Sequence, residues 1–315
     1  MTLQRSHRLI QCLIFFVVSL TTQSTSHGQQ QLAEQEPAAR IADNRTPLQP
    51  AATLSAPFQL SAEEQRRVDL ILLHWENKTK HIRHFSCKFY RWEYQPQWAK
   101  DAWSQSVART VSEGMIDHQT PDKANFQVTK FQVLQGKGND GKPAYLAEKH
   151  LEHWICDGNK IYEYEPRQQH VIERRLPPEW QGKSILEGPL PFLFGAKAKT
   201  LKTRYWIKEL TPQAKDEIWL DIHPRNRESA VNFQSVQVML ATSDFLPNGM
   251  RIVRHDGSSM TFSFFDRSAN SRRMIPQMSG LWGGKYRPTI PAGWKRVVEN
   301  QAGPVPEKKR RLLPR

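Results

Sequence analysis

The sequence is short of cysteine and of long apolar runs. It holds three cysteines in 315 residues, which is too few for a scaffold held together by disulfides. Beyond its first residues, no stretch approaches the roughly 18 consecutive apolar residues that indicate a membrane-spanning helix. These two shortages exclude the small disulfide-rich class and the class of proteins that cross a membrane repeatedly on helices.

Motifs for common enzyme chemistry are also missing. There is no Gly-x-Gly-x-x-Gly, no phosphate-binding loop, no Gly-x-Ser-x-Gly and, after the first residues, no Cys-x-x-Cys. His150 and His153 would point to opposite faces of a strand, so they cannot readily hold one metal ion. Glu148, Glu152 and Asp157 are carboxylates near one another in sequence, and we interpret them as solvated strand faces and a turn. We therefore expect no catalytic residue, no metal site and no cofactor.

What the chain does have is aromatic residues and positive charge. Its 10 Trp, 14 Phe and 7 Tyr argue for a packed core, because disordered chains are poor in aromatic rings. The 45 basic and 31 acidic residues give a net charge of +14. That balance excludes an acidic solvating protein and favours contact with anionic surfaces.

The chain begins with the pattern of an export signal. Arg5 and Arg8 precede a short apolar run at residues 9–20, and small polar residues follow. We predict a signal peptide over residues 1–27, with an uncleaved anchor as the alternative, and a protein exported to the periplasm or cell envelope. Residues 28–57 are rich in Gln, Ala and Pro and predict a disordered linker.

Export bears on the two remaining cysteines, Cys87 and Cys156. In an oxidising compartment they can form a disulfide between two strands. The alternative is two separate buried thiols that behave as small apolar side chains. The sequence leaves both possibilities open.

The leading element is an amphipathic helix predicted over residues 61–80. Ser61 and Glu64 have the spacing of a capping box, and apolar residues then recur at helical intervals. Strands follow, the first over residues 87–94, where alternation places Cys87 and Phe89 on one face. Further strands are predicted over residues 126–133, 145–156, 160–164, 170–176, 204–210, 217–222, 233–240, 250–255 and 260–265.

Two other segments stand out. Residues 177–195 are apolar and punctuated by proline, which predicts helical turns that interrupt two antiparallel meanders. Together with the leading helix they would cover one face of the sheet, leaving either a filled core or an apolar pocket. Residues 299–315 form a basic, Pro-rich tail, which we expect to contact an anionic envelope surface rather than nucleic acid.

Residues 154–166 (WICDGNKIYEYEP) resemble the signature hairpin of LolA-type periplasmic lipoprotein carriers. Residues 122–126 (DKANF) lie where that family has a strand entry, and residues 184–194 where it places a lid-like helical segment. The later Asp256-Gly257 turn and residues 288–294 (PTIPAGW) follow in the same order. The resemblance spans residues 58–298 and is shared by a family of uncharacterised secreted bacterial proteins built on this domain.

This resemblance implies a mainly β (α+β) fold: a half-open antiparallel β-barrel of about eleven strands with an N-terminal helix and a lid-like helical segment. Its apolar cavity would take lipid or lipoprotein acyl chains. The residues expected to line that cavity are Trp75, Phe89, Phe131, Trp154, Leu190, Phe192, Leu193 and Phe194. The carriers' arginine that tethers the lid falls near Lys123, so that role is not transferred.

The predicted function is therefore an exported, monomeric, non-enzymatic protein that holds an acyl chain. One alternative is an envelope structural or interaction module with the same fold and a filled core. The other is a hydrolase, which would require paired carboxylates or a catalytic triad in one cleft.

Overall fold

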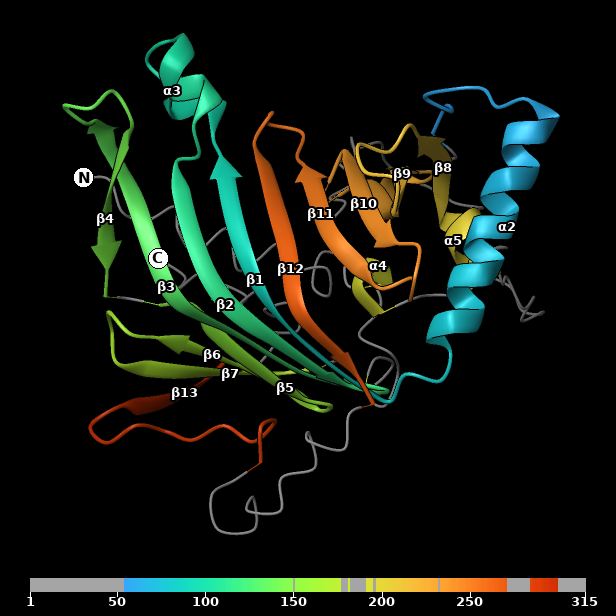
Figure 1. The fold of residues 1–315 in the computed structure, drawn as a ribbon. Helices are drawn as coiled ribbons and strands as arrows, with labels where there is room; N and C mark the ends of the chain where they lie inside the picture. The colour runs from blue at the N-terminus through green and yellow to red at the C-terminus, as the bar shows by residue number, and fades with distance from the viewer. Residues whose placement is uncertain are drawn as a thin grey trace, which may run out of the picture.

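The computed structural model describes residues 54–149, 151–176, 181, 191–194, 197–231, 233–270 and 284–299. Thirteen strands form a single sheet in the order β13-β7-β6-β5-β3-β2-β1-β12-β11-β10-β9-β8, with β4 paired to β3 (Figure 1). The helices are α2 (Ala62–Thr79), η2 (Pro96–Trp98), α3 (Ala102–Ser106), α4 (Pro191–Phe194), α5 (Ala198–Arg204) and α6 (Arg227–Ala230). The strands are β1 (His84–Tyr94), β2 (Thr110–Gln119), β3 (Lys123–Lys137), β4 (Pro143–Glu148), β5 (His153–Asp157), β6 (Lys160–Glu165), β7 (His170–Arg175), β8 (Tyr205–Leu210), β9 (Glu217–Pro224), β10 (Ser235–Ala241), β11 (Pro247–Val253), β12 (Ser259–Ala269) and β13 (Lys295–Glu299).

The sheet curls without closing. Among the described residues no strand pairing joins β8 at one end to β13 at the other. This confirms the predicted fold class, a mainly antiparallel half-open barrel. The strand number differs from the expected eleven or so because β4 lies beside the main path and because β13 adds a parallel strand next to β7.

The predicted helix is present as α2. Ser61 accepts a hydrogen bond from the Glu64 amide, and the Glu64 side chain accepts one from the Ser61 amide, which completes the capping box. Val68, Leu72 and Trp75 are each only 1% exposed. The helix packs against β8 and α5, beside one end of the sheet (Figure 1).

Residues 145–156, predicted as one strand, belong to two strands instead. The long strand β3 pairs with β4 through its C-terminal half and with β5 through its N-terminal half. The sequences of β4 and β5 both look extended and alternating. The break between them is not visible in the sequence, because it depends on how far β3 extends. That prediction was wrong for a non-local reason.

Strand β1 separates two kinds of side chain by simple alternation. Cys87 and Phe89 lie on one face, as predicted, and are buried there with Phe85 on the concave side, while Tyr90 is 39% exposed on the convex face. The concave residues belong to one apolar cluster that also includes side chains of α2, α4 and α5. The concave face is therefore the side that carries the core.

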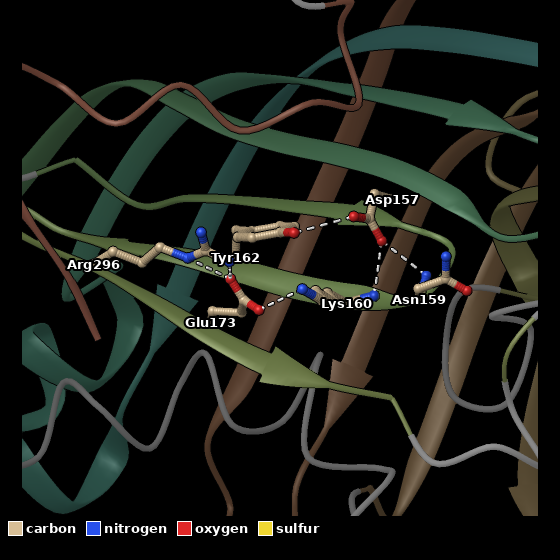
Figure 2. Close-up of polar contacts among 6 residues, drawn as sticks. All are labelled: Asp157, Asn159, Lys160, Tyr162, Glu173 and Arg296. Atoms are coloured by element: carbon tan, nitrogen blue, oxygen red, sulfur yellow. Dashed lines mark hydrogen bonds and ion pairs between the residues drawn. The ribbon is translucent and has the colours of Figure 1, made fainter. Parts of the chain in front are cut away.

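The hairpin that suggested the family is built by turn chemistry (Figure 2). Asp157 Oδ1 accepts from the amides of Asn159 and Lys160, both at 2.8 Å, and Tyr162 Oη donates to Asp157 Oδ2 at 3.2 Å. On the convex face, Glu173 of β7 accepts from Arg296 Nε at 2.6 Å. Lys160 Nζ lies 2.7 Å from the other oxygen of Glu173. The Arg296 contact joins β13 to β7, and the Lys160 contact joins β6 to β7.

Several predicted segments lie outside the described residues. They are the signal peptide (1–27), nearly all of the linker (28–57), most of residues 177–195 and the tail beyond residue 299. The described chain begins at Leu54, whose amide donates to the Arg225 carbonyl at 2.6 Å. No helix in the described ranges is long and apolar enough to span a bilayer.

Gly114 of β2 lies where another strand residue would not fit. A Cβ at this position would be 2.3 Å from the Gln127 carbonyl oxygen and 2.5 Å from Cζ of Phe89. We predict that Gly114→Ala lowers the free energy of unfolding by about 1–3 kcal/mol, since it overpacks the core. Urea unfolding measures this, with Gly284→Ala as the control because no atom of the described residues lies within 4 Å of where its Cβ would be. Equal stability of the two variants would contradict the prediction.

Candidate ligand site on the concave face

Three aromatic rings from three strands stack across the concave face. The centroid of Phe89 (β1) is 5.0 Å from that of Phe126 (β3), with 18° between the planes. The Phe126 centroid is in turn 5.5 Å from that of Trp154 (β5), at 7°. Phe126 and Trp154 are direct partners in the β3–β5 register. The result is a continuous aromatic surface, here called the aromatic stack.

The structure brings together the described members of the predicted cavity lining. Trp75, Phe89, Trp154, Phe192 and Leu193 belong to one apolar cluster. Phe131 is half-buried and packs against the same cluster. Leu190 and the side chain of Phe194 lie outside the described part of the chain. That these residues line a ligand cavity remains a prediction.

A buried arginine lies beside the middle ring of the aromatic stack. Arg91 is 4% exposed, and its Nε donates to Ser112 Oγ at 2.9 Å while its Nη1 donates to Glu152 Oε2 at 2.8 Å. Glu93 Oε1 is 3.1 Å from Arg91 Nε. The guanidinium carbon lies 5.7 Å from the centroid of the Phe126 ring. Charged groups and apolar surface therefore meet on one face.

A second ion pair lies nearby. Glu163, 3% exposed, accepts a hydrogen bond from Arg174 Nη1, and Arg174 Nε donates to Glu299 of β13 at 2.7 Å. Glu163 is the register partner of Trp154 across β5 and β6. We name the set of Arg91, Glu93, Ser112, Glu152, Glu163 and Arg174 the buried charge cluster.

Trp154 connects the aromatic stack with the buried charge cluster. Its side chain is 4% exposed. Among the described residues, its indole Nε1 has no hydrogen-bond partner. A buried N–H without an acceptor costs free energy, because the hydrogen bond to water is lost and not replaced.

The electrostatics of the buried charge cluster centre on Glu152. Burial raises the pKa of Glu152 above the ordinary value, and the Glu93 and Glu163 carboxylates add to the rise, while pairing with Arg91 opposes it without cancelling it. The interpretation of Glu152 as a solvated strand residue was therefore wrong. One sequence signal could have found the cluster: Arg91 and Glu93 continue the buried alternation of Phe85, Cys87 and Phe89.

The two cysteines are free and buried. They lie on β1 and β5, which β2 and β3 separate in the sheet. Three strand spacings put them about 14 Å apart, whereas a disulfide needs Cα atoms within about 7 Å. Burial raises the pKa of both thiols, that of Cys156 to about 12. The structure thus has the second alternative, two separate thiols.

Within the described ranges, no group of three or more His, Cys, Asp or Glu side chains is arranged to hold a metal ion.

No family model and no curated protein matches the sequence. Among solved structures, the chain is similar to an uncharacterized conserved protein from Thermus thermophilus, with 4% identity, TM-score 0.39, and coverage of 75% of this chain and 99% of that one. It is similar to a LolA superfamily protein from Nitrosomonas europaea, with 13% identity, TM-score 0.27, and coverage of 65% and 94%. It is also similar to the Mycobacterium tuberculosis lipoprotein LppX, with 11% identity, TM-score 0.31, and coverage of 64% and 94%.

These likenesses are too low to say anything about ligand or activity. The fold class is established by the chain's own topology: one curled, open, mainly antiparallel sheet with a leading helix and short helices over its concave face. This is the half-open, mainly antiparallel sheet with a leading helix that the resemblance of the hairpin and its neighbouring motifs implied.

The thiols provide a direct chemical check on the strand order. We predict that Cys87 and Cys156 fail to react with a thiol reagent in the folded protein, because both are buried and their thiolates are disfavoured. Both should react once the protein is unfolded without reductant. A mass change on reduction, or failure of either cysteine to react in the unfolded protein, would contradict the placement of Cys87 and Cys156 as separate free thiols.

Glu152 predicts a pH effect on stability. Because its pKa is raised in the folded state, the folded protein binds this proton more tightly than the unfolded chain does. Its contribution to stability is present below the ordinary glutamate pKa and is lost as the pH rises toward the folded pKa. Wild-type protein should therefore lose stability relative to Glu152→Gln between about pH 4.5 and about pH 7.

Urea unfolding of both proteins at the two pH values measures this difference. Glu148→Gln, at the end of β4, is the matched control, and its difference from wild type in free energy of unfolding should be the same at both pH values. If the difference between Glu152→Gln and wild type also stays constant, or if wild type becomes relatively more stable as the pH rises, then burial does not destabilise the Glu152 anion.

Proposed function

We propose that this protein is an exported, non-enzymatic binding protein that holds a lipid or lipoprotein acyl chain along its concave face. The observation that carries the proposal is the aromatic stack, which crosses three strands and has Arg91 of the buried charge cluster beside its middle ring, Phe126. An apolar surface bordered on one side by charged groups matches a molecule that has an acyl chain and a polar head.

The aromatic stack can supply affinity for an acyl chain. Burial of apolar surface contributes roughly 25 cal/mol per Å², so an extended chain along Phe89, Phe126 and Trp154 would bind mainly by apolar contact. The indole N–H of Trp154, which has no acceptor within the described chain, offers a donor to an ester or amide oxygen at the polar end. Ser112 is less suited to nucleophilic catalysis, because its Oγ accepts from a guanidinium group.

Access to the concave face requires that its cover moves. The described cover consists of the 18-residue helix α2 and of two short elements, α4 and α5, with four and seven residues. The two ends of the sheet are not joined by strand pairing among the described residues. Displacing a short helical segment from an open sheet breaks fewer hydrogen bonds than parting two strands would.

A second candidate is a structural or interaction module with the same fold. The observation that favours it is near-complete burial, since Trp75, Phe89 and Trp154 are 1%, 0% and 4% exposed. Such burial is also what a filled core would show. The two candidates differ in whether an acyl chain can displace the cover.

Native mass spectrometry of the purified protein, with titration of a fluorescent fatty acid, tests this difference. We predict a bound or bindable acyl chain, and at least tenfold weaker binding for Phe131→Glu, which places a charge against the apolar cluster. Phe265→Glu is the matched control, since Phe265 stacks on Tyr90 at 4.9 Å on the convex face. Thermal unfolding verifies that both variants fold. Absence of any acyl-chain binding by wild type would favour the structural module.

A further inference from the structure

One end of the sheet carries a compact projection, here called the tip. It consists of residues 95–109, which include η2 and α3, and the β3–β4 turn at residues 137–142. Figure 1 shows α3 and this turn projecting from the same end of the sheet, away from α2. The tip was not predicted to have a role.

Hydrogen bonds fasten residues 95–109 to β3 and β4, the two strands that the turn at residues 137–142 connects. The Leu134 amide donates to the Arg109 carbonyl at 3.0 Å, and Arg109 Nη1 donates to the Leu134 carbonyl at 2.7 Å. Tyr145 Oη donates to the Ala108 carbonyl at 2.8 Å. Within residues 95–109, Asp101 and Ser104 cap α3. The tip is therefore a built surface with internal contacts.

The tip exposes apolar side chains. Trp98 is 48% exposed, and Leu146 of the adjoining strand β4 is 58% exposed. Trp103 is half-buried, and Lys137 Nζ lies 6.0 Å from the centroid of its ring. An exposed tryptophan on a projection is costly in water, and its amphipathic ring is well suited to the boundary between water and lipid.

The tip exposes positively charged side chains to solvent. Lys100, Lys137 and Lys142 are exposed, and no ion pair within the described residues engages them. The acids beside them have local partners, since Asp101 Oδ1 accepts from the Ser104 amide at 2.7 Å and Asp140 Oδ1 from the Lys142 amide at 3.0 Å. The lysines therefore remain available to an anionic surface.

We propose that the tip is a docking surface for a bilayer that contains anionic phospholipid. Trp98 would sit among the headgroups, and the three lysines would lie against lipid phosphates. The charge of the whole chain, +14, has the same sign. An exposed indole on the same projection as three exposed lysines matches a lipid surface better than it matches a purely polyanionic partner, which would leave the apolar side chains in water.

This inference does not depend on acyl-chain binding, although the tip adjoins the candidate site. The Arg109 amide donates to the Glu93 carbonyl at 2.7 Å. Docking of the tip would therefore hold the buried charge cluster close to the bilayer surface.

Co-sedimentation with vesicles tests the proposal on the full chain. The vesicles are phosphatidylcholine alone and phosphatidylcholine with added phosphatidylglycerol, each at low and high salt. We expect binding to the anionic vesicles that weakens with salt. Trp98→Ala should weaken it about tenfold, and Lys137→Gln with Lys142→Gln about 25-fold, at roughly fivefold per lysine near an anionic surface.

Matched controls separate the contribution of the tip to vesicle binding from that of the overall positive charge. The basic tail stays unchanged in every variant. Leu73→Ala removes a 52% exposed apolar side chain on α2. Lys199→Gln with Lys215→Gln removes the same charge from exposed positions outside the tip. Both controls should bind as wild type does. No binding to anionic vesicles, or equal losses in tip and control variants, would overturn the proposal.

Discussion

A β-strand directs every second side chain to the same face, and this constraint shapes the concave side of the sheet. On β1 it places Phe85, Cys87 and Phe89 on the face that also holds Arg91 and Glu93. Because both sets of side chains lie under one cover, the strand cannot bury the apolar residues and leave Arg91 and Glu93 in water. Residues from other segments must therefore satisfy the charged groups, and Ser112 of β2 and Glu152, which lies between β4 and β5, both accept hydrogen bonds from Arg91.

Stability alone does not explain why these charges are retained. A buried ion pair loses much of its Coulombic gain to desolvation, and apolar residues of similar volume often stabilise a core as well or better. The buried charge cluster holds three glutamates and two arginines, so its charges do not balance within itself. Burial raises the pKa of Glu152, and the Glu93 and Glu163 carboxylates raise it further. A polar border to the proposed ligand site would give a reason for these charges that core packing does not.

Local features were predictable from the sequence, and pairings between distant segments were not. The capping box of α2, the turn at Asp157 and the alternation of β1 each depend on residues within one short window. The partners Arg91 and Glu152 are 61 residues apart. The division into β4 and β5 depends on the length of β3. The parallel pairing of β13 with β7 joins segments that no local pattern connects.

The two ends of the concave face differ in polarity. Near β8, the helix α2 covers the face with fully buried apolar side chains. At the far end the face finishes in charged groups, and the tip begins where the Arg109 amide meets the Glu93 carbonyl. The apolar end is thus closed by a long, well-capped helix, and the polar end adjoins an exposed tryptophan and exposed lysines. An amphipathic molecule on this face would lie with its chain toward α2 and its head toward the tip, because each part then meets groups of its own polarity.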